Sequence, residues 1–256
     1  MVGAQPGAGK TKLISESRHF FNYNCVTING DDYRESHPFF YIIANENGKN
    51  IAEFTEPSVR DWTSRLFNFS IDNSYNTILE ITLRQHMPIL ASMEKMFNHK
   101  YKIHLRILAV KKEFGTLGIH YRYEFHKQTQ GFGRWTTQES HDASYNNMPQ
   151  TVSLIERSPF LSSISIYDRA NSILYEKHRD LYSNWFNNDI SATQTIKNFR
   201  NKPLTEQDKY HLDKSWNDIL VKKQNRHAPA DEIEIVKKII HDLTFEAKPQ
   251  VFQFRP

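Results

Sequence analysis

Cysteine is almost absent from this chain, which has one, Cys25, among its 256 residues. A single cysteine cannot form an intrachain disulfide, so the fold must rely on a packed core, and a cytoplasmic location is the simple expectation. Cys25 lies in an apolar segment, where we expect a core residue rather than a nucleophile.

Long hydrophobic runs are also missing. No apolar stretch approaches the ~18 residues that a membrane span needs, and the first residues lack the basic and then apolar pattern of a signal peptide. No segment repeats at a fixed period, and no low-complexity tract is present. Twelve histidines show no zinc-ligand spacing. These absences favour a globular protein without a membrane span.

What is present is the composition of a well-packed domain, with 38% hydrophobic and 13% aromatic residues. The formal net charge is +4. This mild excess suits binding of anionic nucleotides but does not by itself indicate a nucleic-acid partner, and we expect none.

Short runs rich in β-branched residues alternate with longer helical patterns, which predicts an α/β fold with a parallel sheet covered by helices on both faces. The expected strands are Cys25–Asn29, Thr77–Ile81, Ile103–Val110, Ser163–Tyr167 and Ile173–Tyr175. The expected helices of this part are Lys10–Phe20, Ser58–Asp72, Pro88–Asn98, Lys112–Gln128 and Thr137–Glu156.

From about Ala170 the pattern becomes helical, with expected helices at Leu174–Asn187, Thr205–Asn225 and Asp231–Leu243. Aromatic residues recur there at helical spacings. Packing against the first part of the chain would explain them, and a partner-binding face is the alternative. These aromatic residues are Tyr182, Trp185, Phe186, Tyr210 and Trp216.

The chain opens with AQPGAGKT at positions 4–11, followed at once by a helical pattern. This segment fits the P-loop pattern, with Ala4 in place of the first glycine. Glycines let backbone N–H groups approach phosphate oxygens, and the following helix adds its positive end. Lys10 would reach the β- and γ-phosphates and Thr11 would bind Mg²⁺. The expected nucleotide-binding residues are Gln5, Pro6, Gly7, Ala8, Gly9, Lys10 and Thr11. An ordinary glycine-rich turn is the alternative.

Only Met1, Val2 and Gly3 precede this segment. A buried strand of about five residues normally leads into a P-loop. We therefore expect a truncated first strand. Either residues upstream of Met1 are missing, or another segment fills the central position of the sheet.

A second polar cluster, NGDDYRESHP at positions 29–38, follows the next expected strand. Ligands of open α/β sheets bind beyond the carboxyl ends of the strands. Asp31 and Asp32 would therefore lie where a general base or a Mg²⁺-linked carboxylate is useful. An Asx-type cap of the next helix is the alternative.

Five segments, in this order, resemble motifs of the zeta toxins of bacterial toxin–antitoxin systems: QPGAGKT, DDYRESHP, TILEITLR, AVKKEFGTLGIHYRYE and GRWTTQESHD. The resemblance runs from about Val2 to Tyr175. It implies a P-loop kinase-like parallel sheet flanked by helices in a bacterial cytoplasmic protein. We accordingly expect a kinase domain at 1–175 and a helical extension at 176–256.

Zeta toxins transfer a phosphate to the 3′-hydroxyl of the amino sugar in UDP-N-acetylglucosamine, which starves cell-wall synthesis, and an antitoxin blocks their nucleotide site. The resemblance implies that ATP or GTP is the donor and Mg²⁺ the metal, and that an antitoxin chain or an upstream inhibitory segment is the partner. It implies Asp31 as catalytic base beside Lys10, and Arg122 and Arg134 as ligands of the transferring phosphate. The implied acceptor contacts are Asp31, Thr63, Ser64, Glu80, Thr82 and Arg84.

Some positions depart from the family pattern. Ile81 stands where zeta toxins usually have glycine, and Ser64 stands where a glutamate is usual. Both changes affect the acceptor side, so a kinase for another small hydroxylated acceptor, such as a nucleotide cofactor or an antibiotic, stays open. So does an inactive module that binds nucleotide or a partner. Glu80 could instead pair with Arg84 for structure alone, and Arg122 could be a solvated charge on a helix.

Overall fold

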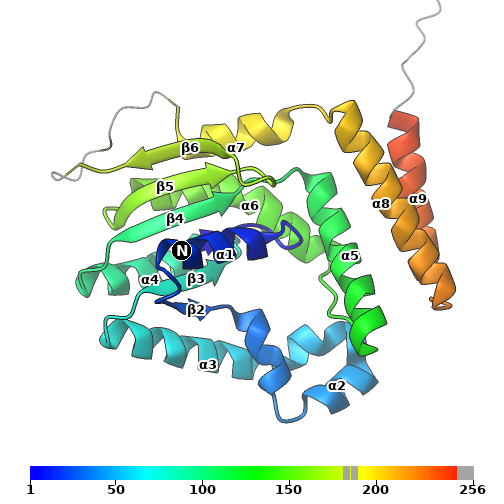
Figure 1. The fold of residues 1–256 in the computed structure, drawn as a ribbon, viewed down its shortest axis with the longest axis horizontal. Helices are drawn as coiled ribbons and strands as arrows, with labels where there is room; N and C mark the ends of the chain where they lie inside the picture. The colour runs from blue at the N-terminus through cyan, green and yellow to red at the C-terminus, as the bar shows by residue number, and fades with distance from the viewer. Residues whose placement is uncertain (181–184, 186–189, 247–256) are drawn as a thin grey trace, which may run out of the picture.

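The computed structural model describes residues 1–180, 185 and 190–246. Its centre is a six-stranded sheet in the order β2-β3-β1-β4-β5-β6 (Figure 1). The first five strands are parallel, and β6 runs antiparallel to β5. The strands are β1 Val2–Gly3, β2 Val26–Ile28, β3 Thr77–Ile81, β4 Ile103–Leu108, β5 Leu161–Tyr167 and β6 Ile173–His178. The predicted P-loop kinase-like sheet is thereby confirmed.

Helices cover both faces of this sheet. They are α1 Lys10–Phe20, α2 Phe40–Asn47, α3 Ile51–Asp72, α4 His86–Asn98, α5 Lys112–Gln130, α6 Gln138–Arg157, α7 Ala192–Asn201, α8 Glu206–Asn225 and α9 Ala230–Glu246. Two short 3-10 helices, η1 Gly30–Ser36 and η2 Gly48–Asn50, flank α2. No helix within the described residues is long and apolar enough to cross a membrane.

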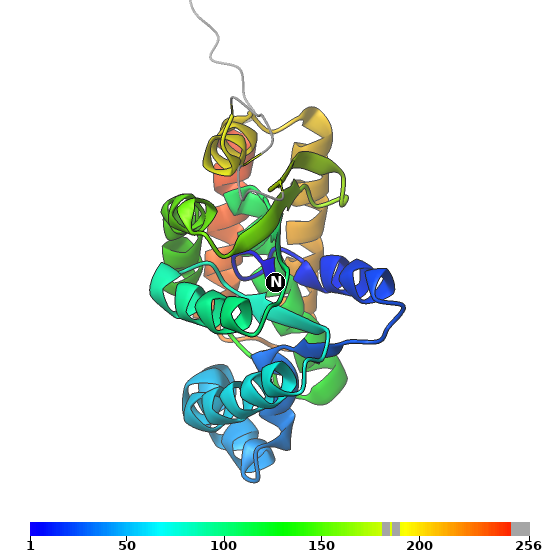
Figure 2. The same ribbon diagram turned by 90° about the vertical axis from the view of Figure 1, so that its left-hand side faces the viewer.

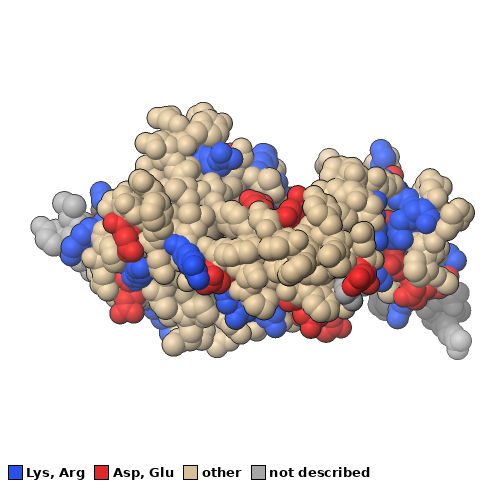
Figure 3. Space-filling model, turned by 90° about the horizontal axis from the view of Figure 1, so that it is seen from below, with Lys and Arg blue, Asp and Glu red and all other residues tan. Residues whose placement is uncertain are grey.

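Two apolar cores lie on opposite faces of the sheet. Alternating side chains of β4 show the division, since Ile103, Leu105 and Ile107 pack with α3, α4, α6 and α7, whereas Leu108 packs with α1, α5, α8 and α9. Figure 2 shows α1 on one side of the sheet and α4, α6 and α7 on the other. On the surface shown in Figure 3, basic and acidic side chains are interspersed.

The first strand is short, as expected, but it holds the central position itself. Val2 pairs with Glu80 of β3 and with Arg106 of β4, and Gly3 pairs with Ile81. Val2 is 1% exposed. The alternative that another segment fills the centre of the sheet is therefore wrong for the described part of the chain. The carboxyl end of β1 delivers the phosphate loop to the middle of the sheet edge.

The helix predicted at Leu174–Asn187 is wrong over the residues described. Ile173–His178 forms β6, in which Tyr175 pairs with Ile166 of β5. An open sheet edge offered hydrogen bonds to this segment, and that long-range pairing overrode its helical spacing. The remainder of the predicted helix, with Tyr182 and Phe186, lies outside the described residues except for Trp185.

The later helices agree better with prediction. Thr205 caps α8 in a capping box with Asp208, and α9 begins at Ala230. Trp216 is buried against the α1 side of the sheet, whereas Tyr210 is 68% exposed. Helices α8 and α9 thus share a core with the sheet. The sequence missed α2, and it missed α7, whose first turn is capped by Ser191.

Candidate functional site

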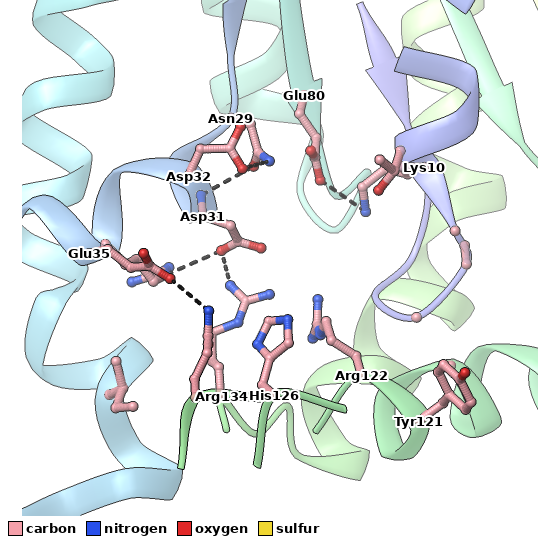
Figure 4. A pocket seen from close by; sticks show the side chains of 18 of the residues that line it. Lys10, Asn29, Asp31, Asp32, Glu35, Glu80, Tyr121, Arg122, His126 and Arg134 are labelled. Atoms are coloured by element: carbon pink, nitrogen blue, oxygen red, sulfur yellow. Dashed lines mark hydrogen bonds and ion pairs between the residues drawn. The ribbon is translucent and has the colours of Figure 1, made fainter. Parts of the chain in front are cut away.

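A cavity of about 680 Å³ opens at the carboxyl ends of β1, β2 and β3 (Figure 4). The phosphate loop, η1, the end of β3 and one face of α5 form its walls. It brings together predicted residues that are far apart in the sequence. Those that line it are Gly7, Ala8, Gly9, Lys10, Thr11, Asp31, Glu80, Arg122 and Arg134.

The phosphate loop has the backbone that its glycines allow. Gly7 and Gly9 have φ angles of 74° and 91°, in the left-handed region that favours glycine, and α1 begins directly after Gly9. The loop therefore turns directly into α1, and both the loop and the start of the helix line the cavity, an arrangement suited to binding anions.

Helix α5 approaches the phosphate loop more closely than any side chain would permit. A Cβ on Gly7 would lie 2.0 Å from the carbonyl oxygen of Gly115, and a Cβ on Gly118 would lie 2.0 Å from the carbonyl oxygen of Gly7. Sequence reasoning missed Gly115 and Gly118. The available signal was a pair of glycines one turn apart inside a helical pattern, which indicates close backbone contact.

Lys10 is held in the cavity by a carboxylate. Its Nζ lies 3.3 Å from Oε1 of Glu80 and donates to the carbonyl oxygen of Ala4 at 3.3 Å. Burial lowers the pKa of Lys10 below its ordinary value, and the carboxylate of Glu80 acts in the opposite direction. Among the ion pairs of the described residues, Glu80 pairs with Lys10 and not with the exposed Arg84. The alternative Glu80–Arg84 pair is therefore wrong.

Asp31 stands in the first turn of η1, where Asn29 supplies the cap. The side-chain oxygen of Asn29 accepts from the backbone N–H of Asp31 at 3.1 Å, and its amide donates to Asp32 at 2.8 Å. This frees the carboxylate of Asp31 to face the cavity, where it is 37% exposed. Its Oδ1 accepts from Nε of Arg34 at 3.2 Å and from Nη1 of Arg134 (Figure 4).

Arg34 lines the cavity and was not singled out by sequence reasoning, although it lies within the DDYR segment. It donates to the carbonyl oxygen of Ala52 at 3.0 Å, to Thr55 at 2.9 Å and to Glu56 at 2.8 Å. These contacts fasten η1 to α3. Arg34 therefore holds Asp31 in position from the side of α3.

Two further arginines face the cavity from the opposite wall. Arg122 projects from α5 and donates to Thr136 at 2.9 Å, and its buried Nε has no hydrogen-bond partner among the described residues. Burial lowers the pKa of Arg122, and it lowers the pKa of Arg134 to about 10, so Arg134 stays charged near neutral pH. The alternative of a solvated charge at Arg122 is wrong. Both cations are available to an anion that enters the cavity.

The other predicted residues lie outside the cavity lining. Thr63 donates to the carbonyl oxygen of Val59 within α3 at 2.7 Å, and Ser64, Thr82 and Arg84 are exposed. The buried side chain of Gln5 donates to Val110 at 3.0 Å, and Pro6 is half-buried. Within the described residues, no group of three His, Cys, Asp or Glu side chains is placed to hold a metal ion.

The sheet order, the phosphate loop at the end of the central strand and the basic cavity beside it define a P-loop kinase-like fold. A family model described as Zeta toxin matches residues 1–180. The chain belongs to the zeta toxin family. This membership indicates that the protein is the toxin of a toxin–antitoxin system and has a kinase-like function.

Individual relatives cover much of the chain. It is 28% identical to toxin PezT of Streptococcus pneumoniae serotype 4 over 184 residues, 72% of this chain and 73% of the relative. It is 23% identical to toxin zeta of Streptococcus agalactiae over 95% of this chain and 82% of the relative.

Solved structures agree. A chain from the PezAT chromosomal toxin–antitoxin system of Streptococcus pneumoniae matches with a TM-score of 0.73 and 25% identity, covering 86% of this chain and 85% of that chain. A chain of the AvrRxo1-ORF1:-ORF2 complex matches with a TM-score of 0.54 and 10% identity, covering 94% and 74%, which is a likeness of fold alone.

Proposed function

We propose that this protein is a kinase that transfers the γ-phosphate of ATP or GTP to the 3′-hydroxyl of the amino sugar in UDP-N-acetylglucosamine. The observation that carries the proposal is the meeting of Lys10, Asp31, Arg122 and Arg134 in one cavity at the end of the phosphate loop. Phosphoryl transfer has a loose transition state, so positioning and positive charge provide most of the catalysis. The cavity offers both.

Each charged group has a role that follows from its contacts. The ammonium group of Lys10 binds the donor phosphates in place of the carboxylate of Glu80, because the phosphates and this carboxylate compete for it. Arg122 and Arg134 bind non-bridging oxygens in the forked geometry that lysine lacks. Asp31 accepts the proton of the acceptor hydroxyl, and its two arginine partners hold the carboxylate in position for that step.

The residues present also fit a magnesium ion. The hydroxyl of Thr11 is exposed at the start of α1, and the carboxylates of Asp31 and Asp32 line the same cavity. Hydroxyl and carboxylate oxygens are hard ligands of the kind that Mg²⁺ prefers beside phosphates. Mg²⁺ would neutralise charge on the donor phosphates. Thr11 would hold it at the phosphate loop.

An antitoxin is the proposed protein partner. The relative with the solved structure comes from a toxin–antitoxin system, and an exposed cavity of this charge would need to be blocked until the toxin is released. We propose a bacterial cytoplasmic location for the pair, in keeping with the chain's single cysteine.

The test is transfer of labelled γ-phosphate from ATP–Mg²⁺ to UDP-N-acetylglucosamine, with Lys10→Ala as the control. We expect a phosphorylated sugar nucleotide from the wild type and none above background from the variant. A folded wild-type protein that binds ATP without forming this product would contradict the proposed acceptor.

One set of positions favours a second acceptor. Ser64, Thr82 and Arg84 are exposed outside the cavity lining, and Ile81 stands at the end of β3. The expected acceptor contacts are thus incomplete. A screen of other small hydroxylated compounds, scored by ATP consumption, distinguishes this candidate, because only the true acceptor should raise ATP turnover in a Lys10-dependent manner.

A further inference from the structure

The cavity has two ends, and the proposed chemistry occupies one of them. Figure 4 shows Asp31 and Arg134 at one end and Tyr121 at the other, beyond Arg122. Arg169 also lines the cavity and comes from the turn between β5 and β6, close to the start of α1 (Figure 1). If the phosphate loop holds the donor phosphates, as the proposed function requires, the nucleoside of the donor must lie at the end away from Asp31.

The turn that carries Arg169 is fixed to the phosphate site. Oδ1 of Asp168 accepts from the backbone N–H groups of Ala170 at 2.9 Å and Ser172 at 2.8 Å, which forms an Asx-type turn. Nζ of Lys12, in the first turn of α1, donates to the carbonyl oxygen of Ala170 at 3.0 Å. Lys12 directly follows the phosphate loop. This hydrogen bond therefore holds the turn close to the loop.

The guanidinium group of Arg169 lies against an aromatic ring. It lies over the ring of Phe114, with 5.2 Å between its central carbon and the ring centroid. Phe114 is 8% exposed and stacks in turn with His211 of α8. No acidic side chain of the described residues pairs with Arg169, which is exposed. A planar cation without an acidic partner among the described residues therefore lines the cavity beside the start of α1.

We propose that Arg169 is the surface on which the purine ring of the nucleotide donor stacks, with Phe114 as the positioning residue behind it. Guanidinium planes stack well on aromatic rings, and such stacking is insensitive to the groups on the edge of the base. The arrangement therefore selects a nucleotide over a bare polyphosphate but accepts ATP and GTP about equally.

The test compares ligands with and without a base. Calorimetric titrations use the magnesium complexes of non-hydrolysable ATP and GTP analogues and of tripolyphosphate, which has the phosphates alone. Arg169→Ala should weaken both nucleotide analogues roughly 5- to 150-fold, the range expected for losing one base stack. Its tripolyphosphate affinity should stay within about twofold of the wild type. Arg169→Lys keeps the charge but not the plane, so it should also lose most of the nucleotide affinity.

Arg157→Ala, at the exposed end of α6, is the matched control and should change none of the affinities. Equal weakening of tripolyphosphate and nucleotides in Arg169→Ala would make Arg169 a phosphate ligand and overturn the proposal. Full nucleotide affinity in either Arg169 variant would also overturn it. A wild-type protein that binds neither the nucleotides nor tripolyphosphate would instead refute the proposed kinase function, and this inference with it.

Discussion

At the scale of single residues, the site depends on how Asp31 is held. One arginine, Arg34, comes from the same short helix and anchors it to α3, and the other, Arg134, reaches across the cavity. The two guanidinium groups hold this carboxylate in the cavity, where it can accept a proton late in the transfer. The neighbouring Asp32 accepts a hydrogen bond from the side chain of Asn29 instead, and burial raises the pKa of Asp32.

We predict that Asp31→Asn lowers kcat for phosphate transfer roughly 10²- to 10⁴-fold, the usual contribution of a general base. The KM for ATP should change little, because the amide keeps the shape of the side chain while losing the ability to take a proton. Steady-state kinetics measures both constants. A larger loss of kcat in Asp32→Asn than in Asp31→Asn would reverse the assignment of the base.

At the scale of elements, α5 lies between the phosphate loop and α8. One side of this helix lies against the phosphate loop through Gly115 and Gly118, and Arg122 projects from it into the cavity. Its other side carries Glu124, which is fully buried and pairs with Lys223 of α8 and with Arg226 at the end of that helix. The position of Arg122 therefore depends on contacts at both sides of α5.

Gly118→Ala should disturb the phosphate loop, because the added Cβ would lie 2.0 Å from the carbonyl oxygen of Gly7. Overpacking of this kind costs about 1–3 kcal/mol. We expect a lower urea midpoint and weaker binding of ATP–Mg²⁺, measured by denaturation and calorimetry. Gly48→Ala serves as the control, because its Cβ would meet only Nζ of Lys127 at 3.9 Å. Equal effects of the two substitutions would refute the close-packing argument.

Glu124 should prove important for stability. Its carboxylate accepts from Lys223 at 2.6 Å and from Arg226 at 2.7 and 2.9 Å. Glu124→Gln leaves buried cations without a full counter-charge, which typically lowers the free energy of unfolding by about 3–5 kcal/mol. Urea denaturation measures the loss. The exposed Glu234, paired with Lys237, is the comparison, and Glu234→Gln should change stability by less than about 0.5 kcal/mol.

At the scale of the whole molecule, the same ion cluster joins three parts of the chain. Glu232 at the start of α9 pairs with Lys223 of α8 at 2.9 Å and with Lys49 of η2 at 2.8 Å. It thus links the helices at the carboxyl end to the α2–α3 corner beside the cavity. Because α8 and α9 also contribute to the core on the α1 side of the sheet, the described helices beyond β6 stabilise the region that contains the site.

This cluster predicts how stability depends on pH. Burial by itself would raise the pKa of Glu232, but the hydrogen bonds from its cationic partners outweigh burial and lower this pKa to about 2, against an ordinary value of 4.5. The folded protein therefore binds fewer protons than the unfolded chain, so the stabilisation is complete above about pH 5 and is lost as the pH falls toward 2. The loss should be on the order of 3 kcal/mol. Glu124 acts in the same direction.

Urea midpoints measured between pH 7 and pH 3 check this prediction. Glu232→Gln should be less stable than the wild type at pH 7 and should show a shallower decline in acid. Parallel declines in the two proteins would mean that other carboxylates set the acid sensitivity.

Much of the element pattern could be read from local sequence. Lys10–Phe20 and Thr77–Ile81 were predicted with the bounds that the structure has, because hydrophobic periodicity is set by neighbouring residues. The prediction failed for Ile173–His178, where pairing with β5 decides the conformation. It also missed α2, whose eight residues carry too little periodicity to be distinguished from a loop.

The sequence alone determined the phosphate loop and the place of Asp31, because both depend on short motifs at the ends of strands. Only the tertiary structure decided which side chains meet. Arg134 reaches Asp31 across 103 positions, Glu80 pairs with Lys10, and Gly118 makes room for Gly7. The physical reason is that a motif sets local backbone geometry, whereas a charge finds its partner only when the packing of strands and helices brings distant segments together.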